Sequence, residues 1–68
     1  MKYTFHERFS ELVNQSDLTY EEIAKKLGLK SKGTISKYAS GQIQNIGPVM
    51  IDKIATLFCV SPIWLLGY

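Results

Sequence analysis

Lysines and small hydroxyl residues are concentrated in the middle of this sequence. Five lysines and no acidic residue lie between Ile23 and Ile51, and because the whole chain has a formal charge of +2, the remaining residues carry a net charge of −3. Ammonium groups bind phosphate oxygens, and serine and threonine hydroxyls form hydrogen bonds with phosphates and with base edges. The chemistry that this segment offers is recognition of a polyanion, and nucleic acid is the expected partner.

Catalytic chemistry has no comparable support. Four glutamates could form carboxylate pairs: Glu7, Glu11, Glu21 and Glu22. Two of them, Glu7 and Glu22, stand at positions typical of helix capping. No nucleophile has a base partner, no glycine-rich loop could cradle a phosphate, and a chain of 68 residues leaves little room for a deep cavity beside a core. We therefore expect no enzymatic activity and no cofactor.

His6 and Cys59 are the single histidine and the single cysteine of the chain. One cysteine forms no intramolecular disulfide, and no cluster of metal-binding residues surrounds His6, so we expect no metal site. We expect an exposed His6 and a Cys59 without a redox role. The most apolar stretch, Leu57 to Leu66, is about half of a membrane span. Since no signal-peptide pattern opens the chain, the expected compartment is the cytoplasm, without a membrane partner.

Apolar residues recur at helical spacing along the chain. Leu, Ile, Val and Phe make up 20 of the 68 residues, well above the fraction at which chains stay disordered. The spacing predicts one compact all-α domain over residues 1–68, with five short helices and no strand. The expected helices are residues 5–15, a segment that opens at Thr19 and stops at Gly28, residues 32–40, a helix that begins at Pro48, and residues 63–66.

Capping residues mark the helix starts. Thr4 with Glu7, and Thr19 with Glu22, have the spacing of a capping box, in which a hydroxyl and a carboxylate each satisfy a backbone N–H. Ser31 can cap the next helix, only a few residues after the second one ends. The second and third expected helices are therefore joined by a tight turn.

The third expected helix has a polar side and an apolar side. Lys32, Thr34, Ser36 and Lys37 face outward, and Ile35 and Tyr38 face inward. Two short helices joined by a tight turn, the second with basic and hydroxyl side chains, form the helix-turn-helix arrangement whose second helix enters the DNA major groove. The sequence predicts such a motif over about residues 19–40.

Three segments have the order and spacing of a known family: Leu18 to Gly28, Thr34 to Tyr38 with the following Gly41, and Val60 to Tyr68. With them the chain resembles the lambda-repressor and Cro-like helix-turn-helix family of phage repressors and small bacterial regulators. The resemblance implies sequence-specific binding of double-stranded DNA by a transcriptional regulator, most often a phage-type repressor on a palindromic operator. The last segment resembles one that often precedes a linker and a second domain, so we expect the DNA-binding part of a longer repressor.

The resemblance also implies residue roles. The residues expected to read bases are Lys32, Gly33, Thr34, Ser36 and Lys37, with the two lysines as readers of guanine. The residues expected to contact phosphates are Thr19, Tyr20, Lys30, Ser31, Gln42, Gln44 and Asn45. Helix N-termini and free backbone N–H groups attract phosphate, so these positions are physically suited to the role.

Some positions depart from the family pattern. Gly33 has no side chain where relatives often carry a base-reading one, and the turn before Thr34 is one residue longer than in many relatives. Val13 and Ala39 stand where many relatives have an Arg–Glu pair, which is consistent with the exchange of an ion pair for packing. Cys59 stands at a helix end where glycine is common, so a left-handed conformation there would cost about 1 kcal/mol.

The last expected helix carries a candidate surface for self-association. Its residues are Ile63, Trp64, Leu66 and Tyr68. We expect Trp64 to lie mainly in the core and its neighbours to expose an apolar patch, which suits the dimer contact that a symmetric operator requires. The prediction is a weak homodimer, or one completed on DNA or by a further domain.

Protein binding is the alternative function. The same fold could use the Trp64 end or the third helix to bind an antirepressor or another protein partner. The basic surface of the third helix favours DNA.

Overall fold

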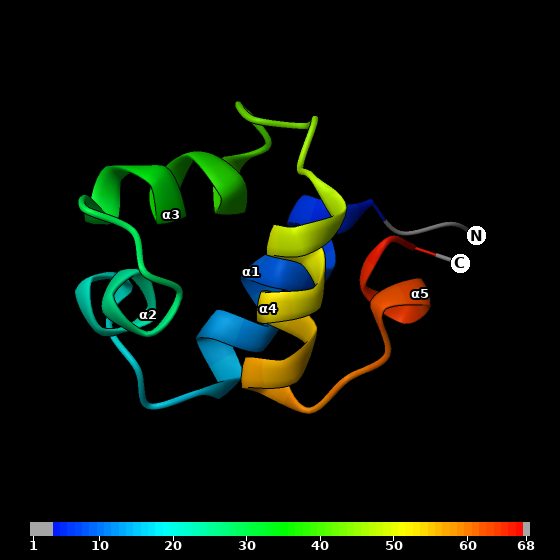
Figure 1. Cartoon of the computed structure of the whole chain (residues 1–68), viewed down its shortest axis with the longest axis horizontal. Coiled ribbons are helices and arrows are strands. Elements are labelled where there is room, and N and C mark those ends of the chain that lie inside the picture. Colours follow the sequence, from blue (N-terminus) through cyan, green and yellow to red (C-terminus); the bar gives the residue numbers. More distant parts are fainter. Residues whose placement is uncertain (1–3, 68) are drawn as a thin grey trace.

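Five α-helices account for most of residues 4–67, the part of the chain that the computed structural model describes. They are α1 (Phe5–Gln15), α2 (Tyr20–Lys26), α3 (Lys32–Ser40), α4 (Pro48–Phe58) and α5 (Pro62–Leu65). Figure 1 shows α1 and α4 in the middle of the molecule, with α2 and α3 on one side and α5 on the other. No strand occurs within the described residues, and the expected all-α fold is confirmed.

Both expected capping boxes form. The backbone N–H of Thr19 donates to Glu22 Oε1 at 3.0 Å, and the backbone N–H of Glu22 donates to Thr19 Oγ1 at 3.2 Å. At the start of α1, the backbone N–H and the hydroxyl of Thr4 donate to Glu7 Oε1 at 3.3 and 2.9 Å. These bonds satisfy groups that a helix start leaves free, and so they fix where α1 and α2 begin.

Four residues with a positive φ lie at helix ends, and Gly67, with a φ of +96° after α5, is one of them. Gly28 has a φ of +77° after α2, and Gly41 has a φ of +84° after α3. Cys59 ends α4 with a φ of 57° and a ψ of 44°, as the sequence allowed for, and a residue with a side chain pays about 1 kcal/mol for that conformation. The fifth helix runs one residue earlier than expected, because Ser61 caps it and Pro62 is its first residue.

The core is built around Phe9. Its ring stacks on Phe5 with centroids 5.4 Å apart and meets the rings of Tyr38 and Phe58 edge-on at 6.1 and 6.3 Å. The buried residues are Phe9, Val13, Ile23, Ala24, Leu27, Ile35, Tyr38, Ile51, Ile54, Ala55 and Leu65. They come from every helix, so the position of each helix depends on the others.

Apolar side chains join α1 to the end of α3. Val13 is buried in the core, and Ala39 packs against the core. Nearby, the Ser10 hydroxyl donates to the carbonyl of Ala39 at 3.1 Å. Apolar packing and one hydrogen bond therefore hold the end of α3 on α1.

The expectation of an exposed His6 is wrong. The side chain is partly buried, and its Nδ1 lies 3.0 Å from Thr4 Oγ1. Gly41 is close to the ring, since a Cβ built on it would lie 3.1 Å from His6 Nδ1. The absence of a side chain on Gly41 lets the first turn of α1 lie beside the end of α3.

Candidate nucleic-acid interface

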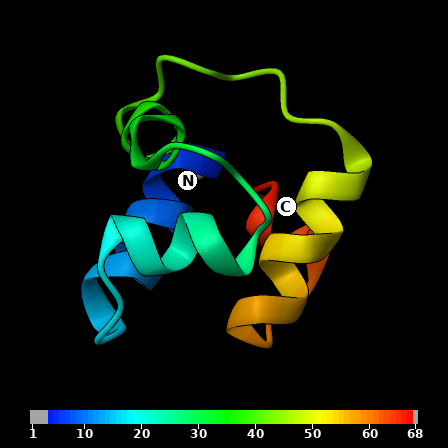
Figure 2. The same cartoon turned by 60° about the vertical axis from the view of Figure 1, so that its left-hand side comes forward.

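The two helices of the expected motif pack on each other, and α1 holds α3 from the other side. Figure 2 shows α3 nearly end-on above α2, with the turn after Gly28 leading from one to the other. Leu27 is buried at the end of α2, and Leu29 packs against the core within the turn. These two leucines fix the turn, and therefore the direction in which α3 leaves it.

The outer side of α3 is polar and open to solvent. Its exposed residues are Lys32, Gly33, Ser36, Lys37 and Ser40. Ile35 and Tyr38 are buried on the other side, as expected. Lys32, Gly33, Ser36 and Lys37 share one face because residues four apart in a helix are neighbours. We call these four residues the α3 stripe.

Thr34 differs from the other residues expected to read bases. Its side chain is partly buried, whereas the α3 stripe is exposed. The structure therefore brings four of the five candidates onto one open face and places Thr34 at its edge.

The cap at the N-terminal end of α3 gives a structural reason for a glycine at position 33. The Ser31 hydroxyl oxygen accepts a hydrogen bond from the backbone N–H of Gly33 at 3.1 Å, which caps the helix as expected. A Cβ on Gly33 would lie 3.2 Å from that oxygen, so a larger residue would require the Ser31 hydroxyl to shift by a few tenths of an ångström. The glycine therefore also leaves the first turn of α3 without a side chain between its backbone and an approaching molecule.

The residues expected to contact phosphates lie on both sides of α3. Lys30 and Ser31 are exposed in the turn before it, and the polar residues of the following loop, Gln42, Gln44 and Asn45, are exposed as well. Ile43 and Ile46 alternate with them and pack against the core. Two apolar anchors therefore hold this loop, and its amide side chains point to solvent.

The start of α2 is less open to phosphate than the sequence suggests. The N–H of Thr19 is already bonded to the Glu22 carboxylate. The backbone and hydroxyl hydrogen bonds from Thr19 lower the pKa of Glu22, so its negative charge persists to a lower pH than that of an ordinary glutamate. The exposed Tyr20 side chain remains for a phosphate.

The expected self-association surface is partly described. Ile63 and Leu66 are 65% and 46% exposed on α5 and just after it. Trp64 is partly buried, and the Arg8 guanidinium lies over its ring, 4.3 Å from the centroid. Tyr68 lies outside the described residues. Sequence reasoning missed Arg8, because its contact with Trp64 joins residues far apart in the sequence.

Among residues 4–67, no three histidine, cysteine or acidic side chains are grouped so as to hold a metal ion. None of the helices in this part of the chain has the length and apolar character to cross a bilayer.

Comparison with known proteins gives one match. The family model described as Helix-turn-helix matches residues 10–65, which extend from α1 to the end of α5. No curated protein and no solved structure matches the chain significantly.

Proposed function

The chain belongs to the lambda-repressor and Cro-like helix-turn-helix family of DNA-binding regulators, and on this premise we propose that it binds double-stranded DNA sequence-specifically through α3 in the major groove. The observation that carries the proposal is the α3 stripe, with its two lysines and open first turn. It lies in a segment without acidic residues, Ile23 to Ile51, so no side chain of that segment repels a phosphate. In this proposal residues 1–68 act as one DNA-binding domain in the cytoplasm.

Base recognition rests on Lys32 and Lys37. A lysine ammonium can donate to O6 and N7 of guanine, and each good contact of this kind discriminates against the wrong base by about 1 to 3 kcal/mol. Ser36 lies on the same face and can contact a base or a phosphate. Because Gly33 has no side chain, the backbone of α3 can approach the bases closely there. Thr34 would contact a base from the edge of the exposed face.

Phosphate contacts would fix the position of α3 on the duplex. Lys30 and Ser31 lie before the helix, and the amides of Gln42, Gln44 and Asn45 lie after it. The side chains of Thr19 and Tyr20 would add contacts at the start of α2. Contacts of this type contribute affinity on every sequence and a strong dependence on salt.

A symmetric operator requires a second copy of the protein. We propose that the chain is a phage-type repressor that forms a weak homodimer, or a dimer on DNA, through Ile63, Trp64, Leu66 and Tyr68. Sedimentation should show an apparent mass that rises with concentration, and Ile63→Ser should remove the rise. A constant monomer mass together with one protein per palindromic duplex would contradict the dimer.

A second candidate function is protein binding by the same fold, with an antirepressor or another protein as partner. The exposure of Ile63 and Leu66 favours it, because apolar side chains grouped on a surface often mark a protein contact. The two functions are compatible, since a protein that covers α3 would displace DNA.

Selection from a library of random duplexes tests the proposal. We expect enrichment of one motif with inverted-repeat symmetry. Lys37→Gln should lose the enrichment, whereas Lys53→Gln, the same change on the exposed side of α4, should retain it. Equal retention of all sequences would contradict sequence-specific binding, and no retention at low salt would contradict DNA binding.

A further inference from the structure

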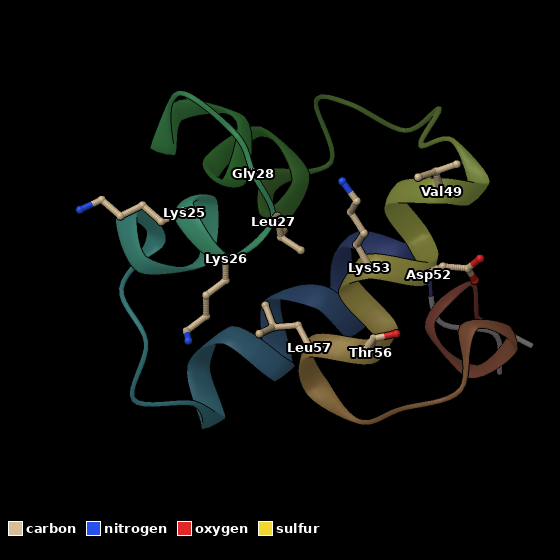
Figure 3. Close-up of a pocket in the computed structure, with 9 residues that line it drawn as sticks. All are labelled: Lys25, Lys26, Leu27, Gly28, Val49, Asp52, Lys53, Thr56 and Leu57. Atoms are coloured by element: carbon tan, nitrogen blue, oxygen red, sulfur yellow. The ribbon is translucent and has the colours of Figure 1, made fainter.

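A groove lies between the C-terminal end of α2 and the exposed side of α4 (Figure 3). It exists because α2 packs mainly on α3 and α4 packs mainly on α5, so that neither helix covers the other. Its volume is about 780 Å³. None of its lining residues belongs to the α3 stripe or to the loop after α3, so the DNA-binding proposal does not account for it.

Three apolar side chains line the groove, among polar and charged ones. Leu27 and Leu57 point into it from α2 and α4, and Val49 lies at its far end, at the start of α4 (Figure 3). Val49 is 68% exposed, the largest exposure among the large apolar side chains described. An apolar strip that continues from the core to an exposed valine would gain free energy if a partner covered it.

The edges of the groove are basic. Lys26 extends from α2 and Lys53 from α4, whereas Lys25 points away (Figure 3). Within residues 4–67, neither Lys26 nor Lys53 is held in an ion pair. Asp52 is the one carboxylate of the lining and points away from α2 (Figure 3). Lysine side chains can lay their methylene groups along apolar surface and keep the ammonium group in water.

Lys26 has one acidic neighbour in its own helix. Glu22 lies one turn earlier, and its attraction to Lys26 contributes to its lowered pKa, after the larger effect of the hydrogen bonds from Thr19. The hydrogen bond from the Thr19 N–H holds the Glu22 carboxylate at the start of α2, whereas Lys26 is the last residue of that helix.

We propose that this groove binds an acidic amphipathic helix of a partner protein. The apolar side chains of that helix would cover Leu57 and Val49 beside the buried Leu27, and its carboxylates would pair with Lys26 and Lys53. An open groove between two helices, apolar along its floor and cationic at its edges, matches the helix-in-groove mode of peptide recognition. A small molecule would remain largely exposed there, whereas small-molecule sites usually enclose most of their ligand.

A synthetic peptide with leucines on one helical face and glutamates on the other is the probe. Added to the isotope-labelled protein, it should shift the amide and methyl signals of Leu27, Val49 and Leu57. A peptide of the same composition, shuffled so that the leucines share no face, should bind at least tenfold more weakly. Equal binding of the two peptides, or shifts confined to α3 or α5, would overturn the proposal.

Matched lysine variants separate this surface from the DNA-binding one. The Lys26→Gln/Lys53→Gln variant should bind the peptide about three- to tenfold more weakly, as expected for the loss of two exposed ion pairs. Lys37→Gln should bind the peptide unchanged, and the duplex more weakly. If Lys53→Gln weakens duplex binding as much as Lys37→Gln does, the groove belongs to the DNA interface and the proposal fails. If the unaltered protein binds the peptide but not the duplex, the proposed DNA-binding function is refuted and the groove proposal stands.

Discussion

The guanidinium of Arg8 lies 4.3 Å from the centre of the Trp64 ring and joins α1 to α5 through a cation–π contact. The contact matters because α5 has only four residues, far fewer than a helix needs to be stable by itself. Leu65, which is fully buried, is the other anchor of this helix. The Arg8–Trp64 contact and Leu65 therefore help to position the surface proposed for self-association.

A double-mutant cycle measures the contact between Arg8 and Trp64. Arg8→Gln and Trp64→Leu should each lower the free energy of unfolding, and the double variant should lose less than the sum. We expect a coupling of about 0.5 to 2 kcal/mol, the range of cation–π contacts. Urea denaturation of the four proteins gives the value. Additive losses would show that the two residues contribute to stability separately.

The contact between His6 and Gly41 predicts an unequal effect of two glycine substitutions. Gly28→Ala and Gly41→Ala both place a side chain at positive φ, which costs about 1 kcal/mol. Nothing lies within 4 Å of a Cβ on Gly28, whereas a Cβ on Gly41 would meet the His6 ring at 3.1 to 3.3 Å. Gly41→Ala should therefore be the more destabilising, and His6→Ala should reduce its excess cost. Equal losses for the two variants in urea would contradict the contact.

The lowered pKa of Glu22 predicts an acid-dependent loss of stability. The hydrogen bonds from Thr19 hold the pKa of the folded state below that of the unfolded state, so this contribution is complete above the unfolded-state value. It is lost as the pH falls from the ordinary glutamate value of 4.5 through the lower pKa of the folded state. Urea denaturation at pH 7 and pH 3 should show a smaller acid-induced loss for Glu22→Gln than for the unaltered protein. Glu21→Gln, in the same turn but without a part in the capping hydrogen bonds, is the matched control and should keep the full loss.

Base contacts and phosphate contacts should respond differently to substitution. Lys37→Ala should weaken binding to a selected duplex by about 1 to 3 kcal/mol and leave binding to a scrambled duplex nearly unchanged. Lys30→Ala should weaken both equally and reduce the slope of log affinity against log salt by about 1. Fluorescence anisotropy at several salt concentrations checks both. Equal losses on the two duplexes for Lys37→Ala would contradict its role in reading bases.

Local signals made most of the fold predictable. Each helix-start signal spans at most four residues of sequence. The structure has a helix start at each of them: the capping boxes at Thr4 and Thr19, the cap at Ser31 and the first-turn Pro48. The inward positions of Ile35 and Tyr38 follow from helical spacing alone. The α3 stripe could be predicted for the same reason.

The features that sequence reasoning missed depend on which helices meet. Arg8 lies over Trp64 because α1 crosses α5, and His6 is partly buried because α1 begins beside the end of α3. The groove at Leu57 exists because α2 and α4 pack on other helices. No spacing along the chain encodes these contacts, since they join residues far apart in sequence.

The central claim is that the α3 stripe is the DNA-binding face. The most direct test is a titration of the isotope-labelled protein with a short duplex, followed by backbone amide shifts at low and then moderate salt. We expect shifts at Lys32 to Lys37, at Lys30, and at Gln42 to Asn45, with binding that weakens steeply as salt rises. An absence of shifts in α3 at low salt, or shifts confined to α5, would contradict the account.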